Sequence, residues 1–95
     1  MSSIRIIAVP PGFAPEYIRE QWVGITIPLA TEEDLKRNPP NGARVGNANV
    51  GGHIVLRDEA AYALHQAGRD EAAAFWRSMP TQYFQFHQDV CELVD

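Results

Sequence analysis

The sequence predicts an α+β domain: a small, bent antiparallel β-sheet of about five strands that carries an inserted helical hairpin. Two patterns support this prediction. Residues 21–29, QWVGITIPL, alternate between apolar and other side chains, which is typical of a half-buried strand. Residues 58–79 contain two stretches with helical apolar spacing, separated by Gly68. We expect residues 1–95 to form a single domain, because so short a chain cannot supply two hydrophobic cores.

The charge of the chain argues against nucleic acid as a partner. Twelve acidic and eight basic residues give a formal net charge of −4, and the basic residues are not clustered as phosphate binding requires. The apolar run of residues 4–9 is too short for a signal-peptide core or a membrane span. Cys91 is the only cysteine, which excludes an internal disulfide. We therefore expect a cytoplasmic protein with neither a nucleic-acid nor a membrane partner.

The N-terminal part predicts two strands joined by a short helical turn. Residues 4–9 are rich in β-branched side chains and form the first strand. Residues 15–20 begin with proline and predict one helical turn. Residues 21–29 are expected at the centre of the sheet, between the first strand and the C-terminal tail. Thr31 and Asp34 then approximate a capping box at the start of another short helix.

The middle of the chain predicts a hairpin followed by two helices. Residues 43–56 contain two short strands around a Gly-Gly pair, the second of them over residues 53–57. Helices are expected over residues 58–66 and 70–79, each begun by a capping aspartate, Asp58 and Asp70. Gly68 is the expected left-handed stop between them. In the second helix one apolar stripe is predicted, formed by Ala72, Phe75, Trp76 and Met79.

The tail returns to a strand pattern. Residues 82–86 predict a strand, residues 87–89 a tight turn and residues 90–94 a last strand. This strand-corner-strand ending resembles the end of SH3-type small barrels, so the sheet is expected to be bent or to form a partly open SH3-like barrel. The resemblance covers only the last dozen residues and implies a fold without an activity.

No catalytic or cofactor motif emerges from the sequence. The glycines of residues 42–52 lack the GK[ST] ending of a phosphate loop and precede a strand, so turn glycines are the better interpretation, and no cofactor is expected. No histidine pair has the HExxH spacing of a zinc helix. His53, His87 and Cys91 remain an alternative set of metal ligands. A reactive Cys91 paired with histidine is the least favoured function, since free cysteine is usually buried.

Aromatic side chains give the leading hypothesis for function. Six of them could contribute to an exposed platform for a partner: Trp22, Tyr17, Phe13, Tyr62, Tyr83 and Trp76. Of these, Trp76 is expected in the core with its helical stripe, and the predicted binding surface is composed of Trp22, Tyr17, Phe13 and Tyr83. Trp22 is either exposed on this platform or part of the core beneath the helices. We therefore expect a non-catalytic protein-interaction domain that binds a protein partner or self-associates. The alternative is a small-ligand or metal-binding accessory protein.

Overall fold

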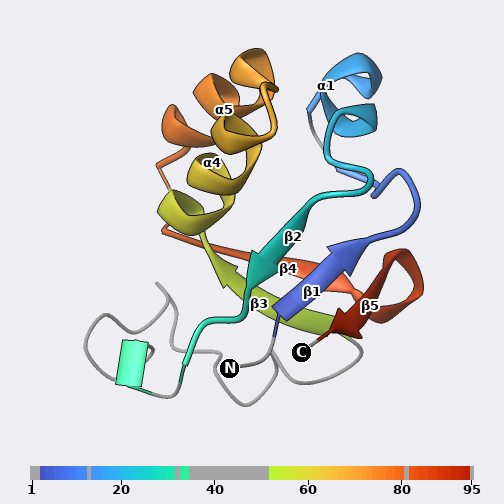
Figure 1. Ribbon diagram of the computed structural model, residues 1–95, viewed down its shortest axis with the longest axis vertical. Helices are drawn as coiled ribbons and strands as arrows, with labels where there is room; N and C mark the ends of the chain where they lie inside the picture. The colour runs from blue at the N-terminus through green and yellow to red at the C-terminus, as the bar shows by residue number, and fades with distance from the viewer. Residues whose placement is uncertain (1–2, 13, 32, 35–51, 81, 95) are drawn as a thin grey trace.

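The computed structural model describes residues 3–12, 14–31, 33–34, 52–80 and 82–94. It confirms the mixed α+β class (Figure 1). The elements in chain order are β1 (Ser3–Ile6), α1 (Glu16–Glu20), β2 (Thr26–Pro28), β3 (Gly52–Leu56), α4 (Arg57–Gln66), α5 (Asp70–Arg77), β4 (Tyr83–His87), the 3-10 turn η1 (Gln88–Val90) and β5 (Cys91–Val94).

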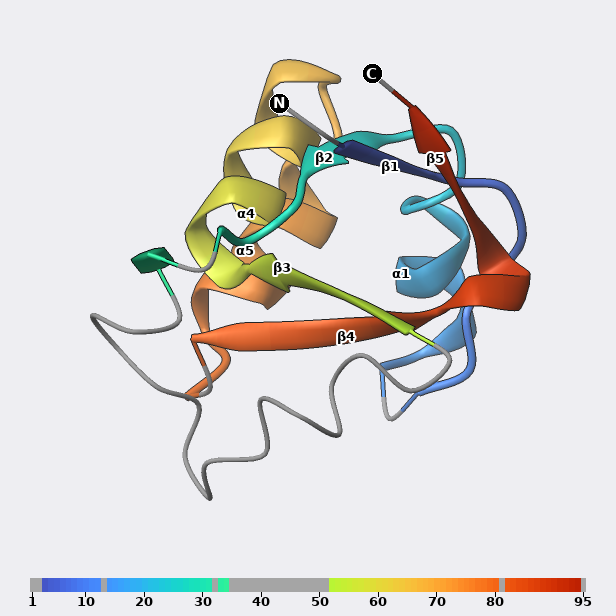
Figure 2. The same ribbon diagram turned by 90° about the horizontal axis from the view of Figure 1, so that it is seen from below.

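The strands form two small antiparallel sheets, one in the order β2-β1-β5 and the other of β3 and β4. Figure 2 shows the sheets as separate layers, with the helices behind them. They meet at one corner, where Leu29 pairs with Val55 and the Ala30 N–H donates to the carbonyl of Ile54 at 2.9 Å. Neither sheet of the described strands is closed. The central strand is β1, so the prediction that residues 21–29 lie at the centre is wrong.

The strand predicted over residues 21–29 is also shorter than expected. Helical hydrogen bonding continues past α1, because the N–H groups of Gln21 and Trp22 donate to the carbonyls of Ile18 and Arg19. Gly24 then takes a φ of +88°, which glycine adopts at little cost, and its N–H donates to the carbonyl of Ile6 at 2.7 Å. Only residues 26–28 are in a regular strand.

Both helices of the predicted hairpin are present, but their expected caps are wrong. Leu56 and Arg69 occupy the N-cap positions, and neither makes a capping hydrogen bond through its side chain. Asp58 is the second residue of α4, and Asp70 is the first residue of α5. In the first turn of a helix a carboxylate still interacts favourably with the helix dipole. Gly68 has a φ of +77° and is the left-handed residue between the helices, as predicted.

The other local predictions have mixed outcomes. The turn at residues 15–20 is confirmed as α1, and the tail is confirmed as β4, η1 and β5. The Thr31 Oγ1 accepts from the Asp34 N–H, and Asp34 Oδ2 accepts from the Thr31 N–H, both at 3.0 Å, as a capping box requires. The second hairpin strand is β3, whereas the first lies outside the described residues.

The core lies between the two sheets and the helices. Ile4, Ile6 and Ile27 come from the first sheet, and Val55 and Phe86 come from the second; all are at most 1% exposed. Helices α4 and α5 contribute four alanines, one leucine and one tryptophan, namely Ala60, Ala61, Leu64, Ala72, Ala73 and Trp76. No helix in the described ranges has both the length and the apolar character needed to cross a membrane.

Candidate interaction surface

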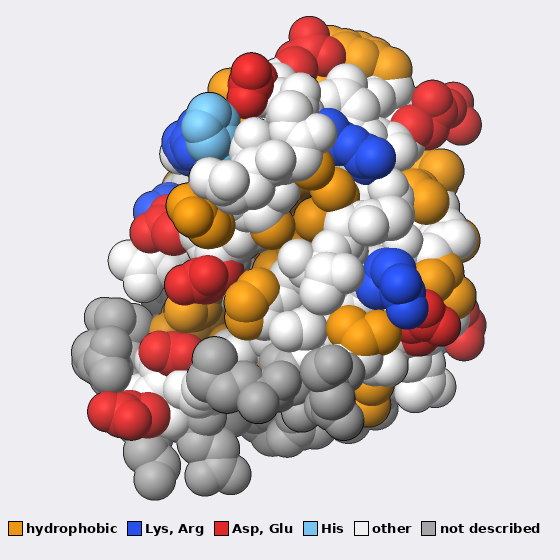
Figure 3. All heavy atoms as spheres, in the orientation of Figure 1, with side chains coloured by type: hydrophobic (Ala, Val, Ile, Leu, Met, Phe, Trp, Pro, Cys, Tyr) orange, Lys and Arg blue, Asp and Glu red, His pale blue; other side chains and the backbone are white. Residues whose placement is uncertain are grey.

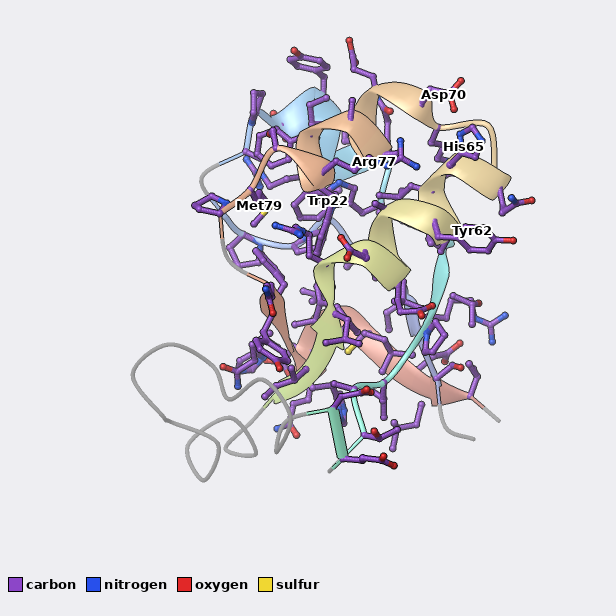
Figure 4. The ribbon with its side chains drawn as sticks, turned by 90° about the vertical axis from the view of Figure 1, so that its left-hand side faces the viewer. Trp22, Tyr62, His65, Asp70, Arg77 and Met79 are labelled. Carbon is purple, nitrogen blue, oxygen red and sulfur yellow. The ribbon has the colours of Figure 1, made fainter. Side chains whose placement is uncertain are left out.

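Trp22 belongs to the core, so the prediction of an exposed platform position is wrong and the alternative, a core position beneath the helices, is confirmed. Its side chain is only 1% exposed and packs edge to face against Trp76, Phe84 and Phe86 (Figure 4). The strand pattern misplaced this ring, because Trp22 lies in the turn after α1 rather than in β2. The indole Nε1 atoms of Trp22 and Trp76 are buried without a conventional acceptor. Neighbouring aromatic rings offer only weak compensation for them.

The other predicted aromatic residues are not brought together. Tyr17 is 59% exposed and lines an open cleft between α1 and the start of α5. Tyr83 is half-buried beside a different cavity, and its hydroxyl donates to the carbonyl of Asp34 at 3.1 Å. Phe13 lies outside the described residues. The predicted platform is therefore not a continuous surface.

The alternative metal ligands are also separated. His53 is opposite Phe86 in the β3–β4 ladder, whereas His87 is opposite Gly52, so the two imidazoles are on opposite faces of the sheet. The His87 Nδ1 is 3.3 Å from a carboxylate oxygen of Asp89. Within the described residues, no group of three or more His, Cys, Asp or Glu side chains is placed to hold a metal ion.

Cys91 is buried at the start of β5. Its side chain is 5% exposed and its Sγ is 3.5 Å from the carbonyl oxygen of His87, which accepts the weak S–H hydrogen bond. Burial raises the pKa of the Cys91 thiol, because the thiolate would lose solvation there. This environment suppresses the nucleophilic form of the side chain.

A groove between α4 and β2 is a further candidate binding feature. It has a volume of about 490 Å³ and lies on the face shown in Figure 3, where apolar side chains gather in the hollow between the two elements. We call it the α4–β2 groove, and it is lined by Gly24, Ile25, Thr26, Pro28, Glu59, Tyr62, Ala63, Gln66 and Ala67. Tyr62 is 59% exposed and extends outward from α4 beside β2 (Figure 4).

One wall of this groove is the outer edge of β2, with which no other strand of the described residues pairs along its length. The carbonyl of Ile25 accepts from the N–H of Ile6, so this carbonyl faces β1, whereas the Ile25 N–H donates to the carbonyl of Trp22. Backbone groups alternate in direction along an antiparallel strand, and the N–H and carbonyl of Thr26 therefore face away from β1, towards α4. Pro28 adds no donor to this edge. Of the described residues that line the groove, Glu59 alone is charged.

The sequence contained one signal for this groove, Tyr62, which the prediction included among the platform aromatic residues but did not single out. Ala60, Ala61 and Leu64 form the buried stripe of α4, and Tyr62 falls outside it. A large apolar side chain on the polar side of a helix marks a surface position. The element that the Tyr62 side chain faces depends on where β2 lies, and helical spacing does not predict the position of β2.

Comparisons with known proteins add no relative: no protein-family model, no curated protein and no solved structure matches this chain.

Proposed function

We propose that this chain is a non-catalytic protein-interaction domain that binds a short extended segment of a protein partner in the α4–β2 groove. The observation that carries the proposal is the combination of an apolar hollow, the exposed Tyr62 on its rim and a strand edge where the backbone of Thr26 faces away from β1. Extended segments are commonly recognised by such a combination of pockets and main-chain hydrogen bonds.

The lining defines the chemistry of the bound segment. An apolar side chain would pack against Ile25, Ala63 and the ring of Tyr62. A lysine or arginine beside it would complement the charge of Glu59, since none of the other described lining residues is basic. Thr26 offers one N–H and one carbonyl to the segment's backbone. Pro28 limits how far the pairing extends, so side chains would supply most of the specificity.

The proposal of a non-catalytic, cytoplasmic role has support of its own. The thiol of Cys91 is buried with a raised pKa, which disfavours the thiolate that nucleophilic chemistry needs. A free, buried cysteine is compatible with a reducing compartment.

We also propose that the five strands follow the plan of a partly open SH3-like barrel. The order β5-β1-β2, the corner at Leu29 and Val55, and the β3–β4 pair together support a continuous path of strands. The helical hairpin α4–α5 is inserted between β3 and β4. An experimental structure with Leu29 and Val55 unpaired would contradict this arrangement.

The binding proposal is tested by panning a random peptide library against the immobilised protein. We expect enrichment of peptides that combine an apolar residue with lysine or arginine. Tyr62→Ser should weaken binding of a selected peptide at least about tenfold, a loss of about 1.4 kcal/mol. Glu59→Lys should remove the preference for basic peptides.

Tyr17→Ser is the matched control, because Tyr17 and Tyr62 are both 59% exposed but lie on different surfaces. This variant should bind the selected peptides as the wild type does. The groove is not the binding site if no peptide family is enriched. It is also not the site if Tyr17→Ser abolishes binding while Tyr62→Ser leaves it intact.

A further inference from the structure

The outer edge of β5 is unpaired. β5 is the last strand of its sheet, next to β1. The carbonyl of Val90 accepts from the N–H of Ile7 at 2.8 Å, so the backbone groups of Val90 and, by alternation, Glu92 face β1. Those of Cys91 and Leu93 face away from the sheet. Among the described residues, no strand pairs with this side of β5.

Within the part of the chain that the structure describes, this edge lacks the features that usually protect an exposed strand. Proteins guard such edges with proline, lysine, a bulge or a covering element. The β2 edge contains Pro28, and the chain beyond it pairs with β3 through Leu29. In contrast, β5 has the sequence CELV without proline or lysine, and Leu93 is 60% exposed.

We infer that two copies of this chain pair antiparallel through their β5 strands, with Glu92 on the two-fold axis. In this register Cys91 of each copy is opposite Leu93 of the second copy, and these outward-facing residues exchange their backbone hydrogen bonds. The exposed Leu93 side chain of one copy would then pack next to Cys91 of the second copy, on the same face of the joined sheet. A continuous sheet across both copies results.

The outer face of the paired strands is also compatible with this register. Val90 of one copy comes opposite Val94 of the other, which gives two apolar cross-strand pairs. The two Glu92 side chains face each other, and this like-charge contact opposes pairing. Each Glu92 carboxylate is, however, already 2.8 Å from the Arg5 guanidinium of its own chain, which reduces the repulsion.

The expected dimer is weak and reversible. Two strands of four residues bury less surface than the roughly 1,200 Å² of a stable complex. Sedimentation velocity of the full chain from about 20 μM to about 1 mM should show a concentration-dependent dimer. Leu93→Lys should shift the dissociation constant at least about tenfold upward, and Glu92→Gln should shift it downward by removing the repulsion. A wild type that stays monomeric throughout this range would overturn the inference.

A disulfide trap tests the register itself, in a Cys91→Ala background. Glu92→Cys places one thiol of each copy directly opposite the other, within the reach of a disulfide, so glutathione buffer should yield a covalent dimer. Arg5→Cys is the matched control: the Arg5 and Glu92 side chains are 48% and 47% exposed on the same face, but Arg5 lies one strand farther from the axis. Equal cross-linking of both variants, or none with Glu92→Cys, would overturn the proposed pairing. Circular dichroism of each variant establishes that it is folded.

Discussion

The indole rings of Trp22 and Trp76 meet edge to face, with centroids 5.3 Å apart and an angle of 64° between their planes. Trp22 comes from the turn after α1, and Trp76 comes from α5, so this contact joins the N-terminal part of the chain to the helical hairpin. Phe84 and Phe86 of β4 extend the same cluster to the second sheet. The pair is therefore placed to stabilise three parts of the fold at once.

Trp22→Ala should lower the free energy of unfolding by about 3–5 kcal/mol, because it removes a buried ring and leaves a cavity among the aromatic residues. Trp22→Phe keeps an aromatic side chain and should cost less. Urea denaturation followed by circular dichroism measures both. Tyr17→Ala is the control, since an exposed ring should change stability by no more than about 0.5 kcal/mol. A Trp22→Ala variant as stable as Tyr17→Ala would contradict the core assignment.

Arg69 holds the turn that carries Trp22. Its Nη1 atom donates to the carbonyls of Gln21 and Val23, the latter at 2.6 Å. Arg69→Ala should therefore destabilise the protein by about 2–3 kcal/mol, since two partly buried carbonyls lose a charged donor. Arg77→Ala, at an exposed position of α5, should be nearly neutral in the same urea titration. Equal effects of the two substitutions would show that the Arg69 contacts do not contribute to stability.

Local features of this fold were predictable where a few adjacent residues determine them. The reciprocal bonds of Thr31 and Asp34 follow from a spacing that places each side chain near the other's backbone. The left-handed backbone at Gly68 follows from glycine between two helical patterns. The helix over residues 70–77 follows from its apolar stripe.

Features that depend on tertiary contacts were not predictable in the same way. The alternation in residues 21–29 is typical of a strand, but Gly24 and the hydrogen bonds to Ile18 and Arg19 keep residues 21–24 in a turn. This change moves Trp22 from the supposed exposed face into the core. The central position of β1 and the α4–β2 groove both depend on strand order, which side-chain periodicity does not encode.

Gly68→Ala tests the left-handed turn between the helices. Apart from Gly68 and its two chain neighbours, no atom of the described residues lies within 4 Å of the position that a Cβ would occupy, so the substitution creates no clash with other parts of the described structure. The φ of +77° is nevertheless unfavourable for alanine, and we expect a loss of about 1–2 kcal/mol in unfolding free energy. Gly68→Asn should cost less, because asparagine tolerates this conformation better. An alanine variant as stable as the wild type would contradict the backbone strain.

Cys91 should make stability depend on pH in the alkaline range. Burial raises the pKa of its thiol, so the folded protein holds this proton more tightly than the unfolded chain does. As pH rises through the range in which an unfolded cysteine ionises, above about pH 8.5, the unfolded state gains thiolate and becomes relatively more stable. The free energy of unfolding should therefore fall more steeply with pH for the wild type than for Cys91→Ala, whereas below this range the thiol contributes no slope.

Urea titrations of both proteins at several pH values measure this difference, since the groups that they share cancel in the comparison. The same burial predicts slow alkylation of Cys91 by iodoacetamide at neutral pH and rapid alkylation in urea, because only the exposed thiolate reacts. Parallel pH profiles for the two proteins would show that the thiol ionises equally in the folded and unfolded states. Rapid alkylation of the folded wild type would contradict the buried position of Cys91 and reopen a catalytic interpretation of this residue.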